Sequence, residues 1–294
     1  MRDTLPDFDY HLPGTIEEVV ELLSRLDDAV ILQGGTDLLV AMKQKGIRPQ
    51  HVVSLKRLRG LLGQVYERDG TIHIGASATL GELQRSAILK KEFVVLHEAV
   101  REIASYQIRN MATVGGNLCN ASPCADSAPP LLVLGAVLRI QSSNGERQLP
   151  IEKFFTGPGE TALRKGEFLK EIEVPRMKAN CGAAFIKLGR RLHEDIAVAS
   201  AACLIQVKEE VVKEIRIALG SVAPIPMRAY KAEDVMRGKP ISEELLMNAS
   251  QVAMTECKPI SDVRASAKYR TAMVGVLTRA AIKEAAARAS ERAT

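Results

Sequence analysis

The sequence predicts an α+β protein, because strand and helix patterns are arranged differently in two parts of the chain. Patterns typical of strands and helices alternate through the first third of the 294 residues. In the last third, three strand patterns come first and two helical patterns follow. A segment containing lysine and glycine at residues 176–182 lies between these arrangements, and we expect a domain boundary there.

Capping boxes and apolar runs predict the elements of the first third. Thr15-x-x-Glu18 and Thr79-x-x-Glu82 each mark the start of a helix. A further helix, capped by Thr36 or Asp37, is expected to run through Met42. Strands are expected at residues 29–32, 51–55 and 71–76.

The rest of the chain divides into a loop-rich middle and a second series of strands and helices. Residues 93–108 are typical of one helix, residues 109–130 of a loop, and residues 131–134 of a short buried helix capped by Asp126 or Ser127. Ser142–Gly145 predicts a hairpin turn between strands at 137–140 and 148–151. The later expected strands are 168–174, 183–188, 197–207 and 211–219, and the later helices are 242–255 and 269–288.

Composition excludes several classes of protein. The net charge of +5 is spread along the chain, aromatic residues make up 4% and tryptophan is absent, which disfavours a nucleic-acid surface. No apolar run approaches the roughly 20 residues that span a bilayer. Residues 1–7 carry charge and proline where a signal peptide needs an apolar core, so we expect a cytoplasmic protein. The five cysteines include no C-x-x-C pair, so we expect free thiols and no bound metal.

Two paired-glycine turns, about 80 residues apart, are the most informative local feature. The first, at residues 33–37, follows the apolar run 29–32, and the second lies at residues 113–117. Glycine pairs let several backbone N–H groups point at one anion. Together the turns indicate a diphosphate held from two sides, and hence a dinucleotide cofactor. Taken singly, the first could be a tight connection and the second a plain Ω-loop; neither is a G-x-G-x-x-G or P-loop motif.

A third point of interest is the segment 187–197, in which a basic cluster precedes an acidic pair. This pattern fits the solvated end of a hairpin. It also fits an electropositive group beside an electron-rich ring, where a cation favours the anionic reduced form. His193 could be an acid or base, or simply a surface residue.

In its two glycine turns and the segment 187–197, the chain resembles the FAD-binding medium subunit of the molybdenum hydroxylases. This family includes xanthine dehydrogenase and aerobic carbon monoxide dehydrogenase. The resemblance runs from Phe8 to about Arg288. Its most specific parts are residues 34–39, residues 107–118, the segment 121–126 and the segment 190–197. It implies a two-subdomain FAD-binding fold of the vanillyl-alcohol-oxidase (PCMH) type followed by a C-terminal α+β domain with an antiparallel sheet and helices. The implied domains are 1–178, with subdomains of about 1–56 and 57–178, and 179–294.

The resemblance also implies which residues hold FAD. Those around the first turn would be Ile31, Leu32, Gln33, Gly34, Gly35, Thr36, Asp37 and Leu38. Those on the other side would be Ala112, Thr113, Gly115, Gly116, Asn117, Asn120 and Asp126, with Leu169 and Lys187 near the cofactor and Lys187 towards the isoalloxazine ring. Gln33 departs from the family, since many members have a small residue there. FAD is expected to be non-covalent, because no histidine or cysteine matches a known flavin tether.

The implied function is electron transfer, with no acid or base of this chain as the main catalytic residue and Lys187 as a group that tunes the flavin. Molybdopterin and [2Fe-2S] clusters would lie only on a large and a small partner subunit, in a dimer of heterotrimers. The electron acceptor could be NAD, a quinone or another molecule. Two alternatives are a standalone flavin-dependent reductase, similar to the enolpyruvyl reductase of cell-wall synthesis, and a flavin-free assembly subunit.

Overall fold

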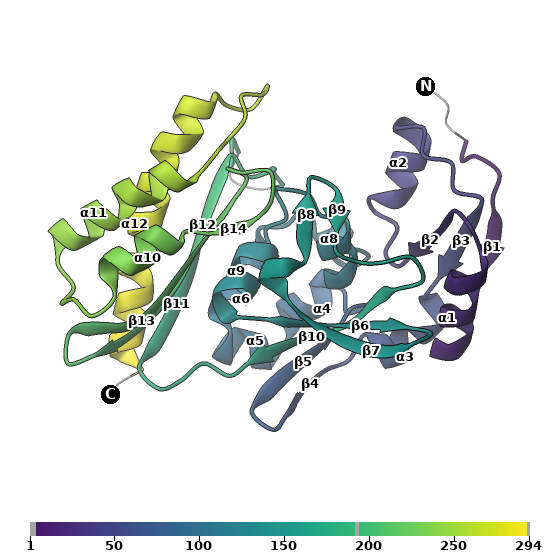
Figure 1. The fold of residues 1–294 in the computed structure, drawn as a ribbon, viewed down its shortest axis with the longest axis horizontal. Helices are drawn as coiled ribbons and strands as arrows, with labels where there is room; N and C mark the ends of the chain where they lie inside the picture. Colours follow the sequence, from purple (N-terminus) through teal and green to yellow (C-terminus); the bar gives the residue numbers. More distant parts are fainter. Residues whose placement is uncertain (1–3, 192–193, 293–294) are drawn as a thin grey trace.

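Three main β-sheets follow one another along the chain in the computed structural model, which describes residues 4–191 and 194–292. Figure 1 shows the N-terminal sheet at one end, the central sheet in the middle and the C-terminal sheet at the other end. A separate buried apolar cluster accompanies each sheet. The predicted α+β class is confirmed.

The N-terminal sheet is parallel and has the order β1-β3-β2. Val19 and Leu23 of the first helix are buried in one cluster with Val53 of the sheet. The elements of this N-terminal part are β1 (Asp9–His11), α1 (Ile16–Arg25), β2 (Ala29–Leu32), α2 (Leu38–Gln44), β3 (His51–Ser54), the 3-10 turn η1 (Lys56–Leu58) and α3 (Arg59–Leu62). The predicted strands 29–32 and 51–55 and the predicted helix starts are therefore present.

The two expected helix caps of this part differ in detail from the pattern. Thr15 Oγ1 accepts a hydrogen bond from Glu18 N–H, but the Glu18 carboxylate accepts from Gly14 N–H and not from the N–H of Thr15. Asp37 precedes α2 and its side chain makes no capping hydrogen bond. The box at Thr79 and Glu82 is complete in both directions.

The central sheet is antiparallel, with the order β4-β5-β10-β6-β7. Its strands are β4 (Val65–Arg68), β5 (Thr71–Gly75), β6 (Val137–Ser142), β7 (Gly145–Pro150) and β10 (Phe168–Pro175). The other elements are α4 (Leu80–Arg85), α5 (Ala87–Glu92), α6 (Val94–Arg101), α7 (Tyr106–Arg109), α8 (Val114–Cys119), α9 (Ala128–Leu134), η2 (Ile151–Lys153) and the hairpin β8 (Phe155–Gly157) and β9 (Glu160–Thr161). The hairpin predicted at Ser142–Gly145 is the β6–β7 turn.

The single helix predicted over residues 93–108 is wrong, because the chain forms α6 and α7 with a break between them. Ala104 has a φ of +45°, which no right-handed helix accommodates. Ser105 then caps the new helix by accepting from Ile108 N–H. The Arg109 guanidinium donates to the carbonyls of Ile103 and Ala104, so the break leaves these backbone acceptors satisfied.

The loop predicted over residues 109–130 is also partly wrong, since it contains α8. Thr113 starts this helix by accepting a hydrogen bond from Gly116 N–H. The glycine-rich composition hid this capping signal. The predicted buried helix begins at Ala128, after Ser127, but neither Asp126 nor Ser127 makes a side-chain capping bond to it.

The C-terminal sheet is antiparallel and covered by helices on both faces. It has the order β11 (Cys181–Leu188), β12 (Ala199–Lys208), β13 (Val211–Gly220), β14 (Met227–Arg228). In Figure 1, α10 (Tyr230–Met236), α11 (Glu243–Glu256) and α12 (Ala267–Glu291) cover its outer face. On the inner face α6 packs against β11, and α9 against β12 and β13. This double cover explains why residues 199–205 are all buried.

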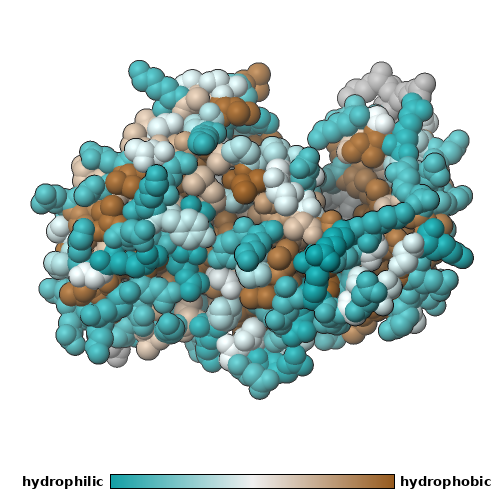
Figure 2. Space-filling view, in the orientation of Figure 1, coloured by the Kyte–Doolittle hydropathy of each residue, from teal (hydrophilic) through white to brown (hydrophobic). Residues whose placement is uncertain are grey.

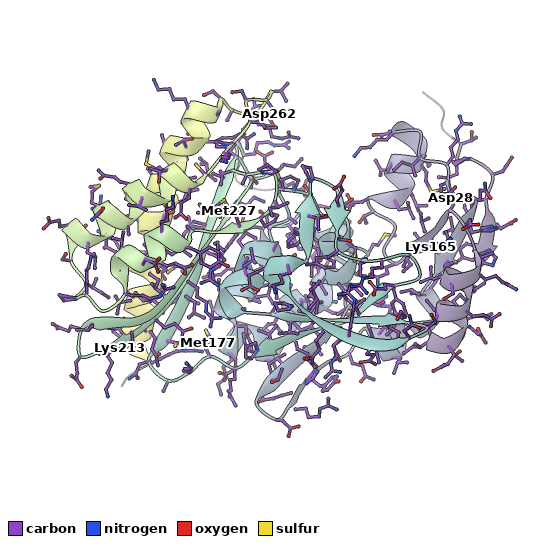
Figure 3. The ribbon with its side chains drawn as sticks, viewed as in Figure 1. Asp28, Lys165, Met177, Lys213, Met227 and Asp262 are labelled. Carbon is purple, nitrogen blue, oxygen red and sulfur yellow. The ribbon has the colours of Figure 1, made fainter. Side chains whose placement is uncertain are left out.

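Residues of β10 and of the segment before it contact the N-terminal lobe, which comprises the N-terminal sheet with α1 and α2. Phe168 of β10 is buried in the apolar cluster of the N-terminal sheet. Lys165, which Figure 3 shows on the same side of the molecule as Asp28, forms an ion pair with Asp27. No helix within the described ranges combines the length and apolar character needed to cross a bilayer.

Candidate functional site

The first glycine turn connects β2 to α2, and both of its glycines are required by the backbone. A Cβ on Gly34 would lie 2.1 Å from the carbonyl oxygen of Met111, so only glycine allows the chain to come this close. Gly35 has a φ of +73°, in the left-handed region. Ile31 and Leu32 end the strand before the turn, and Leu38 begins the helix after it.

Four consecutive backbone N–H groups in this turn have no acceptor in the protein. Within residues 4–191 and 194–292, nothing accepts a hydrogen bond from the amides of Gly34, Gly35, Thr36 or Asp37. These residues are half-buried, except Asp37, which is exposed. Consecutive free amides at a glycine turn form a concave donor surface that suits an anion such as phosphate.

The second glycine turn differs, because its amides are already paired. The N–H of Val114 donates to Ala78 and that of Gly115 to Ala76. The N–H of Gly116 donates to Thr113 Oγ1 at 3.0 Å, and that of Asn117 to the Thr113 carbonyl. The groups at this turn that remain able to meet a ligand are therefore side chains rather than amides.

The structure brings the two turns into direct contact. Thr113 Oγ1 donates a hydrogen bond to Gln33 Oε1 at 2.5 Å, and Ala112 lies against Gly34. Figure 2 shows the surface hollowed between the lobe that carries α2 and the central part of the molecule. The two turns therefore lie together, as a shared ligand would require. The expectation that both turns offer backbone amides to one anion is wrong for the second turn, because its amides are paired within the protein.

Hydrogen bonds continue from the second turn to the C-terminal sheet. Ser127 Oγ donates to Asn117 Oδ1 at 2.6 Å. The neighbouring Asp126 accepts from Lys187 Nζ at 2.8 Å, and both of these side chains are only 6% exposed. Lys187 also donates to the carbonyl of Glu102 at 2.8 Å. These contacts run from Gln33, after β2, through Thr113 and α8 to Asp126 and Lys187 of β11. Because α8 also packs against β10, they link the three sheets.

Asp126 is the most electrostatically perturbed group of this region. Burial raises the pKa of its carboxyl from 3.8 to about 6, although the charge and hydrogen bond of Lys187 act in the opposite direction. Its second oxygen, Oδ1, is buried with no hydrogen-bond partner in the described chain. A buried carboxylate oxygen without a donor is costly, so this atom is available to a ligand hydroxyl.

Two further predicted positions lie near this network. Leu169 of β10 is 2% exposed, in the strand against which α8 packs. Asn120 follows α8 as its C-terminal cap and is exposed. The structure gives neither a side-chain polar contact to the other predicted residues.

The segment after Lys187 forms the connection between β11 and β12. Asp195 Oδ2 accepts from the backbone N–H groups of Arg190 and Arg191, at 2.5 and 3.0 Å, and so closes this loop. Arg191 is 72% exposed, as expected for the solvated end of a hairpin. His193, and Leu192 beside it, lie outside the described residues.

Sequence reasoning did not assign a site role to two residues that shape this network. Ser127 orients Asn117, and its only sequence signal was as a possible helix cap. Glu102 acts through its backbone carbonyl, a group that every residue carries, so no sequence signal could have identified it.

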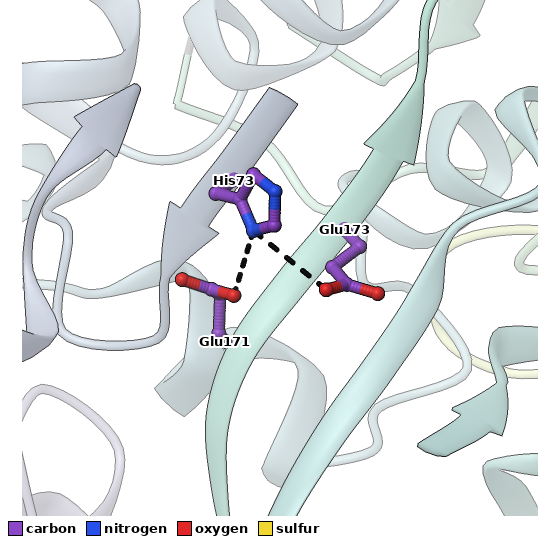
Figure 4. A group of neighbouring side chains, drawn as sticks. All are labelled: His73, Glu171 and Glu173. Carbon is purple, nitrogen blue, oxygen red and sulfur yellow. Dashed lines mark hydrogen bonds and ion pairs between the residues drawn. The ribbon is translucent and has the colours of Figure 1, made fainter. Parts of the chain in front are cut away.

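A histidine and two glutamates on the central sheet form a separate polar cluster, shown in Figure 4. His73 Nδ1 lies 2.8 Å from Glu171 Oε1 and 3.7 Å from Glu173 Oε1. Arg139 Nε lies 2.5 Å from the same Glu173 oxygen, and Tyr66 donates to Glu171. The guanidinium already supplies the positive charge, so the cluster is a satisfied network between strands rather than a good cation site.

The cysteines behave as predicted from their number and spacing. All five are free, and three of them, Cys181, Cys203 and Cys257, are buried. Burial raises the pKa of the Cys203 thiol, so it stays protonated at neutral pH.

Comparisons with known proteins identify the family. Residues 6–177 match the family described as "FAD binding domain in molybdopterin dehydrogenase", and residues 183–285 match "CO dehydrogenase flavoprotein C-terminal domain". The chain belongs to the FAD-binding medium subunits of the molybdenum hydroxylase family.

Relatives of this medium-subunit family match along nearly their whole length. The xanthine dehydrogenase FAD-binding subunit of Escherichia coli O157:H7 is 34% identical over 281 residues, 95% of this chain and 96% of the relative. The carbon monoxide dehydrogenase medium chain of Hydrogenophaga pseudoflava is 34% identical, covering 96% and 98% of the two chains. A solved structure of carbon monoxide dehydrogenase from that organism superposes with a TM-score of 0.94 at 35% identity, over 97% of this chain and 99% of that one.

The residues of this medium subunit fit an FAD molecule. The four free amides at Gly34–Asp37 suit its diphosphate, and the unpartnered Asp126 Oδ1 suits one of its hydroxyl groups. Gly34 has no side chain, and this allows the first turn to lie directly against Met111. The predicted cofactor therefore agrees with both the family and the free donor groups of the first turn.

Proposed function

We propose that this chain is the FAD-carrying electron-transfer subunit of a molybdenum hydroxylase complex. The observation that carries the proposal is the set of four unpaired amides at Gly34–Asp37, directly against a second turn that offers side-chain groups. Membership of the medium-subunit family supports FAD as the ligand. We also propose the division into an FAD-binding domain at 1–178 and a C-terminal domain at 179–294.

In this proposal the cofactor lies against the surface that the two touching turns form together. Residues 31–38 surround its diphosphate on one side. Residues 112–117, with Asn120 and Asp126, hold the diphosphate, ribityl and adenosine parts from the other side. Leu169 and Lys187 lie near the cofactor, with Lys187 towards the flavin ring.

Bound FAD supplies a carrier that accepts electrons singly from [2Fe-2S] clusters and delivers two together to an acceptor. The residues of this chain bind and orient it, exclude water from it and set the charge around it. The Lys187–Asp126 ion pair contributes that charge. No acid or base of this chain needs to move a proton as the main catalytic step.

The relatives support the presence of partner subunits. Relatives such as a carbon monoxide dehydrogenase medium chain and a glyceraldehyde dehydrogenase medium chain are named as parts of multisubunit enzymes. We infer a molybdopterin-binding large subunit and a [2Fe-2S] small subunit, assembled in the cytoplasm as a dimer of heterotrimers. NAD, a quinone or another molecule would be the acceptor. Beside the second turn, Tyr106, Ile108 and Met111 are 57%, 40% and 59% exposed, which supports a partner at this surface.

Purification of the chain from its native source tests the proposal. We expect a flavin absorption spectrum with about one FAD per chain, and co-purification with chains that contain iron and molybdenum. A colourless chain that binds no added FAD would favour the flavin-free assembly subunit. A yellow chain without iron or molybdenum partners would favour the standalone reductase.

A further inference from the structure

The side chain of Gln33 lies between the two glycine turns. It belongs to the first turn, yet its Oε1 accepts the hydrogen bond of Thr113 in the second, at 2.5 Å. The same oxygen would lie 3.8 Å from a Cβ on Gly116, so it reaches the first turn of α8. Gln33 is therefore the polar side chain that bridges the place where the turns meet.

This contact fixes the donor capacity of Thr113. A hydroxyl has one hydrogen to donate, and that of Thr113 is directed to Gln33. One of its lone pairs accepts from Gly116 N–H. The amides of Val114, Gly115 and Asn117 are also paired within the protein. In this state neither the Thr113 hydroxyl hydrogen nor a backbone amide of residues 114–117 is left for an anion. The side-chain Nδ2 of Asn117 keeps its N–H groups, for which no acceptor lies within residues 4–191 and 194–292.

Gln33 also retains side-chain donors at the contact between the turns. Its Nε2 carries two N–H groups, and no acceptor for them lies within residues 4–191 and 194–292. The side chain is half-buried, and the next residue, Gly34, begins the run of free backbone amides. The side-chain donors of Gln33 thus stand beside four backbone donors with no protein acceptor.

We propose that Gln33 is a positioning residue that ties the two turns together through Thr113 and directs its amide N–H groups to the diphosphate of FAD. This inference rests on the proposed function, because the diphosphate belongs to the cofactor assigned there. It adds two side-chain N–H groups to the four free backbone amides of this turn.

Two substitutions separate the tie from the donors. Gln33→Glu keeps an oxygen that accepts from Thr113, but it removes both N–H groups and places a negative charge beside the diphosphate. Gln33→Ala removes the tie and the donors without adding charge. The matched control is Gln251→Glu, which makes the same charge change at an exposed position of α11, in the C-terminal part of the chain.

The first measurement is the dissociation constant of FAD from the full-length apo chain, by quenching of flavin fluorescence. We expect about tenfold weaker binding for Gln33→Ala and about 100-fold weaker binding for Gln33→Glu, as for loss of a hydrogen bond to a charged group with added repulsion. Gln251→Glu should bind within about twofold of the wild type. Thermal unfolding of each apo chain monitors folding separately from affinity.

Two further readouts distinguish positioning from a general structural effect. In the holoprotein, the ³¹P NMR signals of the FAD diphosphate should shift in both Gln33 variants and stay in place in Gln251→Glu. In a double-mutant cycle, Thr113→Ala should weaken FAD binding at least threefold less when residue 33 is already alanine, because the tie is then absent.

The outcomes separate the two levels of inference. A wild-type chain that binds no FAD would overturn the proposed function and this inference together. A wild-type chain that binds FAD, with unchanged affinity and ³¹P signals in both Gln33 variants, would overturn the role of Gln33 alone. Weakened binding in both variants, with shifted ³¹P signals and a non-additive cycle, would support it.

Discussion

Lys187 and Asp126 form a buried ion pair, with Nζ 2.8 Å from Oδ2 and each side chain 6% exposed. The pair joins β11 of the C-terminal sheet to the segment before α9 of the central part. The cation is therefore not an isolated charge, and removing either partner leaves the other buried without compensation. Any influence of Lys187 on a flavin depends on Asp126.

The first prediction concerns the reduction potential of bound FAD at pH 8. Asp126→Asn leaves Lys187 uncompensated and should raise the potential, because a cation favours the anionic reduced form. Lys187→Met should lower it by a smaller amount, because the orphaned carboxylate gains a proton and cancels part of the change. We expect the larger shift to be about 30 mV, which is about 1.4 kcal/mol for a two-electron couple.

A dye-coupled redox titration of the holoprotein measures these shifts. The double variant Lys187→Met/Asp126→Asn removes both charges, so the reduction potential of its FAD should be close to that of the wild type. Identical potentials in all four proteins would rule out a tuning role for the pair.

The second prediction concerns stability and pH. Burial raises the pKa of Asp126 from 3.8 to about 6, so between these values the folded state holds a proton that the unfolded state releases. This group's contribution to the free energy of unfolding should fall by about 3 kcal/mol as pH rises through this interval, and no further above it.

Comparison with Asp126→Asn isolates the effect from other titrating groups. Urea unfolding of both chains at pH 4 and pH 7 should show the variant gaining about 2 kcal/mol relative to the wild type at the higher pH, since part of the effect is already lost at pH 4. Parallel pH profiles of the two chains would contradict the raised pKa.

The third prediction concerns the contact between the turns. Gly34→Ala places a Cβ 2.1 Å from the Met111 carbonyl oxygen, so the turns must separate. Such overpacking costs about 1–3 kcal/mol, and we expect FAD binding to weaken at least tenfold. The control is Gly60→Ala, where nothing lies within 4 Å of the new Cβ. Isothermal titration with FAD should show wild-type affinity for the control; equal affinity in Gly34→Ala would refute the close contact.

The fourth prediction concerns a buried carboxylate of the C-terminal domain. Glu233 is fully buried and accepts hydrogen bonds from Arg228, Arg237 and Ile217 N–H. Glu233→Gln leaves the buried Arg228 with only the longer contact to Glu152, at 3.5 Å, and should lower the free energy of unfolding by about 3 kcal/mol. Asp234→Asn, next to it but 67% exposed, should change it by less than about 1 kcal/mol. Denaturant unfolding of both variants tests this, and equal stabilities would contradict the role of Glu233.

Strong local signals allowed much of the fold to be predicted from the sequence. The complete capping box at Thr79 and Glu82 and the apolar strand at residues 29–32 gave elements at the expected positions. The antiparallel strands before α11 and α12 were also predictable, because apolar runs separated by a short charged turn leave few other arrangements.

Two helix boundaries in the middle of the chain were not predictable in the same way, because no standard sequence pattern marks them. The break between α6 and α7 is stabilised by the Arg109 guanidinium, which caps carbonyls several residues away. The helix α8 begins at Thr113 within a glycine-rich segment whose composition is typical of a loop.

The site shows the same division between local and distant signals. The glycine pairs indicated both turns, and their contact through Gln33 and Thr113 agrees with the prediction. The pairing of Asp126 with Lys187 joins positions 61 residues apart, and no local pattern in the chain encodes it. Which amides remain free also depends on distant carbonyls, such as those of Ala76 and Ala78.

The position of the diphosphate in a crystal of the chain with FAD tests the central claim most directly. We expect phosphate oxygens at about 2.7–3.2 Å from backbone nitrogens of Gly34–Asp37, on the face that the second turn completes. A diphosphate bound elsewhere, with these amides facing only water, would contradict the account.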